Sequence, residues 1–207
     1  MSTFISTTFG SISGRHGSAV AKVRRNGKNV LAVFNAPFNP KSVKQVKQRT
    51  KFAFALINLA CFHDLFKKTF KRMDAVNHGI SLALKNSVNG VSPDYSIDFP
   101  KLVFTEGGVC TATVVSADKT IGTSVKVDWS PTESESGKAT DGVSLIFFHE
   151  EYQQAILKEN CAIRPKATLT VELPAEWANG SIHTWIYFTN EEGTRNSKSK
   201  YISLVNL

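Results

Sequence analysis

The sequence predicts an α+β fold in which a basic amino-terminal arm with a β-hairpin and a two-helix segment precede an antiparallel β-sandwich. Residues 41–70 carry apolar side chains at helical spacing, whereas residues 95–205 change to a period of two. Clusters of Gly, Pro, Asp and Ser separate the apolar runs of the second region, as turns do. These observations divide the chain into an arm (1–40), a helical segment (41–90) and a sandwich domain (91–207).

The helix of residues 41–70 begins with a capping-box pattern, Ser42 followed three residues later by Gln45. Apolar or neutral residues then recur every three or four positions and predict one core-facing stripe: Val43, Val46, Thr50, Ala53, Phe54, Ile57, Ala60 and Cys61. A row of lysines lies on one flank of this stripe. The row is either an interaction surface or an ordinary solvated helix face. A kink is expected near Phe62.

A second helix is expected over residues 76–88, with Asn89-Gly90 as its stop signal. The two helices are expected to pack antiparallel.

The arm, residues 1–40, is rich in Ser, Thr and Gly and contains no acidic residue. Two short extended segments, 19–23 and 30–34, flank Arg24-Arg25-Asn26-Gly27. Because Asn-Gly is the strongest two-residue hairpin signal, we predict a small hairpin with its basic side chains gathered near the turn.

The carboxyl region contains segments with strand character at residues 95–99, 101–104, 110–115, 124–129, 143–149, 154–157, 167–173, 182–189 and 200–205. Trp129 ends one of these segments, and residues 183–188 are rich in aromatic side chains. This layout resembles immunoglobulin-like and fibronectin type III domains. The chain has no Cys-Trp-Cys framework, so the fibronectin type III variant fits better.

Charge is divided unevenly between the two parts of the chain. Residues 1–78 contain 14 Lys and Arg but only two acids, a formal +12, whereas residues 79–207 contain 11 basic and 15 acidic residues, a formal −4. A basic excess concentrated in one region indicates an interface with nucleic acid or with an acidic protein surface. The expected interaction residues are Phe9, Arg15, Lys22, Arg24, Arg25, Lys28, Phe34, Lys44, Lys47 and Lys51.

No enzyme motif is present: the sequence has no GxGxxG, GxxxxGK[ST], HExxH or GxSxG. Glu150 and Glu151 are neighbours, so a regular strand points them to opposite faces. His149 and His183 are a weak pair without a third ligand, and the three cysteines have no metal-ligand spacing. We therefore expect no catalytic residue, no cofactor, no metal and no small-molecule substrate.

The amino terminus, MSTFISTTFG, has neither the basic nor the apolar region of a secretory signal, and no stretch reaches the length of a membrane-spanning helix. We expect cytoplasmic synthesis, no membrane partner and, for a virion protein, a final location in the particle.

Several segments together carry a family resemblance: FGSISGRHGSAV, QVKQRTKFAFALINLACFHDLFKKTF, NSVNGVSPDYSIDFPKLVFTEGG and SKSKYISLV. Over nearly the whole chain, the sequence resembles an uncharacterised family of proteins from Bacteroidota and their phages. The resemblance supplies no catalytic residues. It implies a structural character, and a similar layout of arm, helix and sandwich suits virion proteins.

The leading hypothesis is a non-enzymatic phage structural or interaction protein. Its most specific form is an auxiliary or decorating capsid protein that docks on a protein assembly, either capsid proteins or copies of itself, through its basic amino-terminal half. The alternative is a nucleic-acid-binding protein that uses the same arm and helix.

Overall fold

The computed structural model describes residues 2–4, 10–25, 27–35, 39, 41–131 and 136–206. The chain forms two compact units, Met1–Ser42 and Val43–Leu207. Phe9, one of the expected interaction residues, lies outside the described residues.

The first unit contains an antiparallel sheet of four strands in the order β1 (Ser2–Phe4), β4 (Asn29–Val33), β3 (Ala19–Val23) and β2 (Gly14–His16). β3 and β4 are the expected hairpin, and Gly27 supplies a left-handed backbone conformation in its turn. The buried Asn29 side chain donates to the Gly10 carbonyl oxygen (2.9 Å) and accepts from the Ile12 amide (3.3 Å). These bonds hold the segment before β2 against β4.

The second unit begins with helices α1 (Val43–Asn58), α2 (His63–Thr69) and α3 (Ala75–Asn86). A 3-10 turn, η1 (Ala60–Phe62), separates α1 from α2, so the expected kink is present as a break. Gly79 of α3 lies against Phe66 of α2, where an added Cβ would come within 2.8 Å of the Phe66 ring. Only glycine allows the two helices to approach this closely.

A hairpin of β5 (Val88–Val91) and β6 (Asp94–Ile97) follows α3, and the 3-10 turn η2 (Phe99–Lys101) comes next. The second helix therefore ends earlier than expected, because Asn89-Gly90 lies inside a hairpin strand rather than at a helix stop. The expected strand at residues 101–104 is also wrong, since the chain leaves η2 there without joining a sheet.

Two antiparallel sheets complete the unit. The larger has the order β10 (Gln154–Ile163), β9 (Gly142–His149), β12 (Ser181–Thr189), β13 (Lys200–Asn206). The smaller has the order β11 (Thr168–Glu172), β8 (Ser124–Trp129), β7 (Val115–Lys119). Two further 3-10 turns are η3 (Arg164–Lys166) and η4 (Ala175–Trp177). The strand expected at residues 110–115 is displaced to β7, which begins only at Val115.

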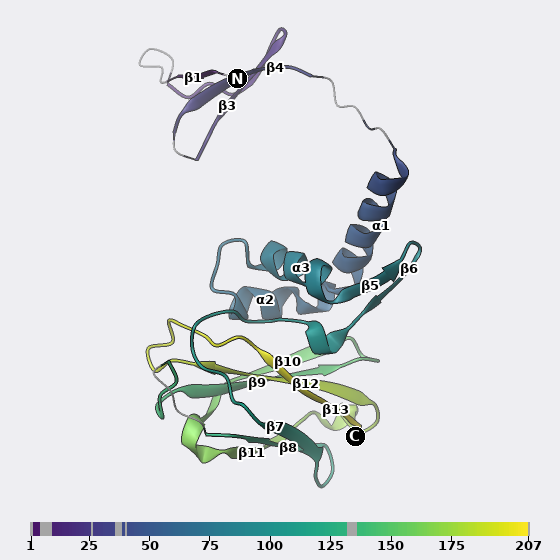
Figure 1. Ribbon diagram of the computed structural model, residues 1–207, viewed down its shortest axis with the longest axis vertical. Coiled ribbons are helices and arrows are strands. Elements are labelled where there is room, and N and C mark those ends of the chain that lie inside the picture. The colour runs from purple at the N-terminus through teal and green to yellow at the C-terminus, as the bar shows by residue number, and fades with distance from the viewer. Residues whose placement is uncertain are drawn as a thin grey trace. The chain divides into compact units, whose positions relative to one another are not determined.

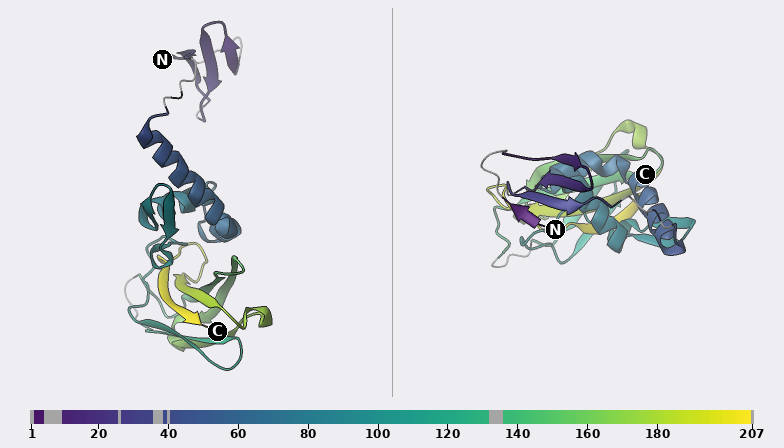
Figure 2. Two further views of the ribbon diagram at one scale, coloured as in Figure 1. Left: turned by 90° about the vertical axis from the view of Figure 1, so that its right-hand side faces the viewer. Right: turned by 90° about the horizontal axis from the view of Figure 1, so that it is seen from above.

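The larger sheet is covered on both faces, so helices, larger sheet and smaller sheet form three layers (Figures 1 and 2). Alternate residues of β9 divide between two cores: Leu145 and Phe147 face the smaller sheet, whereas Ile146 and Phe148 face the helices. β12 is divided in the same way. This arrangement explains why both strands are apolar almost throughout. The fold is α+β, as expected from the sequence.

A buried ion pair closes one end of the two packed sheets. An Arg164 amino group lies 3.0 Å from an Asp141 carboxylate oxygen, and the two side chains are 0% and 3% exposed. The same amino group donates to the Cys110 carbonyl oxygen (2.7 Å), and the guanidinium stacks over the Phe188 ring at 4.1 Å.

Replacing Asp141 with alanine would remove the carboxylate that lies 3.0 Å from the fully buried Arg164 guanidinium. We expect Asp141→Ala to lower the free energy of unfolding by about 3–5 kcal/mol, measured by denaturant titration. The control is Asp64→Ala, which breaks the exposed pair with Lys67 and should leave the unfolding midpoint unchanged. Equal losses in the two variants would show that the buried pair has no special role in stability.

The three-layer packing predicts that the two sheets do not fold cooperatively without the helices. A fragment of residues 108–207 contains both sheets, but it exposes the apolar helix-side face of β9 and β12. We expect this fragment to unfold without cooperativity, whereas residues 43–207 unfold in one cooperative transition followed by circular dichroism. A cooperative transition of the short fragment at the temperature of the long one would contradict this account.

Candidate functional site

The basic residues of the first unit gather at one end of the β3–β4 hairpin. Arg24, Arg25 and Lys28 lie in or beside the turn, and Lys22 lies near the end of β3, all four exposed. The Arg24 amide donates to the Lys28 carbonyl oxygen (2.9 Å), which fixes the turn. The structure thus brings together four of the expected interaction residues.

Arg15 and Phe34 of the same unit contact each other. The Arg15 guanidinium lies 4.0 Å from the centre of the Phe34 ring, and Arg15 Nε donates to the Gly17 carbonyl oxygen (3.1 Å). Phe34 is half-buried in this contact. Arg15 therefore covers part of the Phe34 ring, so less of the ring surface is exposed for contact with a partner.

Of the three expected interaction lysines of α1, Lys51 contacts the rest of the second unit through its side chain. Lys51 Nζ donates to the Leu84 carbonyl oxygen (3.1 Å) at the end of α3, where the helix dipole favours a cation. The Lys47 carbonyl oxygen accepts from the Tyr95 hydroxyl (3.0 Å). Lys44 and Lys47 keep exposed side chains, whereas Lys51 is half-buried.

The apolar stripe that the sequence assigned to the core points into solvent. Val43, Val46 and Ile57 are 71%, 43% and 74% exposed. Thr50, Ala53 and Ala60 of the stripe are exposed as well, and Phe54 and Cys61 are only half-buried. The core-face prediction is therefore wrong for this stripe.

The buried side of the helical segment is a different stripe, formed by Ala55, Leu59 and Phe62. Both stripes have helical spacing, so periodicity alone could not choose between them. Phe62 decides the orientation because its ring packs on Phe148 of β9 (4.5 Å between ring centres) and on Phe104 (5.2 Å). We refer to the exposed positions Val43, Val46, Thr50, Ala53 and Ile57 as the outer seam of α1.

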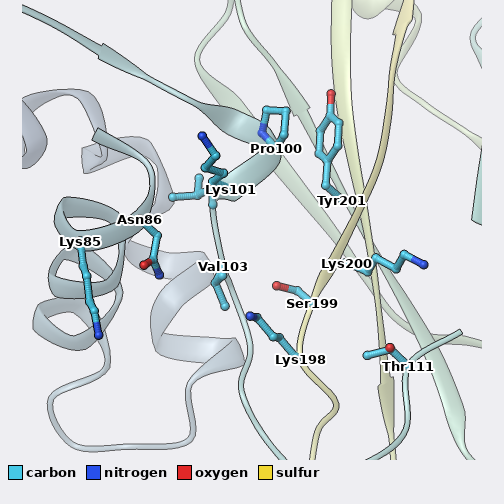
Figure 3. Close-up of a pocket in the computed structure, with 11 residues that line it drawn as sticks. Lys85, Asn86, Pro100, Lys101, Val103, Thr111, Lys198, Ser199, Lys200 and Tyr201 are labelled. Atoms are coloured by element: carbon cyan, nitrogen blue, oxygen red, sulfur yellow. The ribbon is translucent and has the colours of Figure 1, made fainter. Parts of the chain in front are cut away.

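The second unit contains a groove of about 870 Å³ that no sequence pattern predicts. Lys85 and Asn86 of α3 form one wall, the segment Lys198–Tyr201 forms the other, and residues 100–103 run between them (Figure 3). Four of its lining residues are lysines: Lys85, Lys101, Lys198 and Lys200. They come from three separate segments, all within the net-acidic part of the chain (79–207), so no local pattern marks them.

The two histidines considered as a pair do not meet. In the β9–β12 register His149 is opposite Ile182 and His183 is opposite Phe148, so the histidines lie on opposite faces of the sheet. His149 Nδ1 accepts from the Tyr152 amide (3.3 Å), which leaves the proton on Nε2 for the Asn179 carbonyl oxygen (3.0 Å). The His149 ring therefore links the turn at Tyr152 to the loop at Asn179 by hydrogen bonds.

His183 lies 3.0 Å from the Tyr201 hydroxyl through Nδ1 and 3.7 Å from a Glu150 carboxylate oxygen through Nε2. Burial lowers the pKa of His183, and the Glu150 carboxylate opposes this only in part. Burial also raises the pKa of the Tyr201 hydroxyl. Both shifts favour the neutral forms, which is the opposite of an activated tyrosinate.

The remaining reactive groups have similarly unreactive settings. Burial raises the pKa of the Cys61 thiol to about 11 and also raises that of Cys161, so neither is a ready thiolate. Within the described part of the chain, no three His, Cys, Asp or Glu side chains are arranged to hold a metal ion. None of the described helices is both long enough and apolar enough to span a membrane.

No curated protein matches the sequence significantly. Residues 10–203, nearly the whole chain, match a family described as "Family of unknown function (DUF6266)". The match runs from the segment before β2 into β13, so it includes the basic turn, the outer seam of α1 and the lysine groove. The chain is a member of this family of unknown function.

Proposed function

We propose that this protein is a non-enzymatic interaction protein that docks on an acidic protein assembly through the outer seam of α1. The single observation that supports the proposal is the seam itself, a mostly apolar helix face whose five side chains are all exposed, although the Thr50 hydroxyl lies 3.4 Å from the hydroxyls of Ser92 and Tyr95. Ala55 is the only buried residue among the 16 residues of α1, and all residues from 43 to 50 are exposed.

The spacing of the seam favours a helix as its occupant. The positions 43, 46, 50, 53 and 57 alternate steps of three and four, which is the spacing of the a and d positions of a coiled coil. An amphipathic partner helix could insert its apolar side chains between Val46, Ala53 and Ile57. Burying such side chains contributes about 25 cal/mol per Å² of apolar surface.

The charges beside the seam favour an acidic partner. In the heptad defined by Val43 at position a, Lys47 takes position e and Arg49 takes position g, the positions whose charges select a coiled-coil partner. α1 contains four basic residues and no acid. Pairing α1 with a second α1 would bring like charges together within about one Debye length of 8 Å, so we infer a different, acidic chain.

More specifically, we propose that the protein is an auxiliary or decorating capsid protein of a phage. The basic hairpin turn would then make a second contact with the assembly. The seven strands β7 to β13 support a fibronectin type III-like domain, because three pack in one sheet and four in the other around a shared core. Domains of this kind are common interaction modules, so this support is an analogy of fold.

Site-specific photo-cross-linking tests the proposal. We would place a photoreactive phenylalanine analogue at position 53, in the middle of the seam, in protein produced in its native host. Irradiation is expected to give one main adduct with a protein whose cross-linked segment is an acidic amphipathic helix. The same analogue at position 121, where Ile121 is 93% exposed, should give no such adduct.

Two matched substitutions test the charge argument. Both Val46→Glu and Val46→Lys remove an apolar contact, but only glutamate adds repulsion against an acidic helix. We expect Val46→Glu to reduce the position-53 adduct by at least about tenfold more than Val46→Lys. An adduct with nucleic acid, lost when Arg24, Arg25 and Lys28 are all serine, would favour the nucleic-acid alternative, and an adduct with a second copy would contradict the acidic partner.

A further inference from the structure

The lysine groove is a second site, separate from the outer seam of α1 and formed wholly within the second unit. Its lining residues come from α3, from η2 and the segment after it, from Thr111, and from the two residues before β13 together with the start of that strand. No carboxylate is among these lining residues. Apart from Lys101, which pairs with Asp98 just outside the lining, these lysines create a positive potential that attracts anions.

Two of the four ammonium groups already have partners. Lys101 Nζ lies 2.6 Å from an Asp98 carboxylate oxygen, and Lys200 Nζ donates to the carbonyl oxygens of Ala112 (3.1 Å) and Thr113 (2.5 Å). These contacts fix the lysine stems that line the groove. An ammonium has three donors, so the two carbonyl bonds leave one donor of Lys200 unused.

The other two ammonium groups are available. Neither Lys85 Nζ nor Lys198 Nζ makes a hydrogen bond or an ion pair within the described ranges of the chain. Lys85 belongs to the α3 wall and Lys198 to the opposite wall, with residues 101–103 between them (Figure 3). One anionic ligand lying across these residues could therefore contact both walls.

The donors favour phosphate over carboxylate. All four cationic lining residues are lysines and none is arginine, whereas planar carboxylates are matched best by the two-pronged arginine side chain. A phosphate group offers several acceptor oxygens in a tetrahedral arrangement, which single ammonium groups can approach from different walls. Asn86 and Thr111 add uncharged donors to the lining.

The volume favours a ligand with more than one phosphate. At about 870 Å³ the groove is in the upper part of the range of small-molecule sites, about 300–1,000 Å³, and far exceeds one phosphate ion. We propose that the lysine groove binds a phosphate-bearing polyanion through Lys85 and Lys198. The source of these phosphates is either a nucleic-acid backbone or a free polyphosphate.

Isothermal titration of the full chain with tripolyphosphate at low salt tests this site. We expect saturable binding that weakens by at least about tenfold in the double variant Lys85→Gln/Lys198→Gln, because each substitution removes a charge-assisted contact. The matched control is Lys119→Gln/Lys158→Gln, which removes the same charge from exposed positions outside the groove. Its affinity should change less than about twofold, and both variants should keep the thermal unfolding midpoint of the wild type.

A second measurement separates the two phosphate sources. The site is assigned to nucleic-acid backbones if a fluorescein-labelled oligothymidylate binds the wild type and is displaced by tripolyphosphate, and if the Lys85→Gln/Lys198→Gln variant, but not the control variant, loses this binding. Binding of tripolyphosphate without the oligonucleotide assigns it to free polyphosphates.

Three results would overturn the groove proposal: no saturable heat with tripolyphosphate, equal losses in the two double variants, or tighter groove-dependent binding of a polyglutamate peptide. Val46→Glu, which tests the outer seam, should leave tripolyphosphate binding unchanged. A failure of the docking function is thereby distinguishable from a failure of the groove.

Discussion

The contact of Phe62 with the larger sheet is the interaction on which the rest of the second unit depends. Its ring lies against Phe148 and Phe104, and Phe104 in turn packs edge-on against Trp185 of β12 (5.0 Å between ring centres). Aromatic pairs at these distances add to the free energy of burial. Because Phe62 is fully buried at the end of η1, it also fixes which side of the preceding helix faces the protein.

The Phe62 contact constrains both the composition of the larger sheet and the orientation of α1. β9 and β12 must be apolar on both faces, since one face meets the smaller sheet and the other meets the helices. With Ala55 and Leu59 turned inward beside Phe62, the seam of Val46, Ala53 and Ile57 must point outward. The exposed stripe is therefore a result of the packing and not a local irregularity.

Much of the second unit could be predicted because its strands carry strong local signals. β8 is bounded as expected at Ser124–Trp129, and β9 and β12 extend the expected segments by one residue at their start. The β3–β4 hairpin was also predictable from its Asn-Gly turn. Asn89-Gly90 misled the prediction because the same dipeptide can end a helix or lie in a hairpin, as it does in β5.

The candidate sites were harder to predict, for two physical reasons. α1 has two apolar stripes, and only the tertiary position of Phe62 decides which one is buried. The groove joins Lys85, Lys101 and Lys198, which the fold brings together from separate elements. Summed charge points to residues 1–78, whereas these lysines belong to the part whose net charge is −4.

Hydrogen–deuterium exchange tests most directly whether the outer seam is a vacant interface. In the isolated protein, we expect the backbone amides of residues 47–50 to exchange close to unfolded rates, because that part of the helix buries no side chain. The amides of residues 55–62 should be protected by the Phe62 contact. Binding of the cross-linked partner should slow exchange at residues 47–50 by at least about tenfold. Strong protection of these amides in the isolated protein, or no change when the partner binds, would contradict the account.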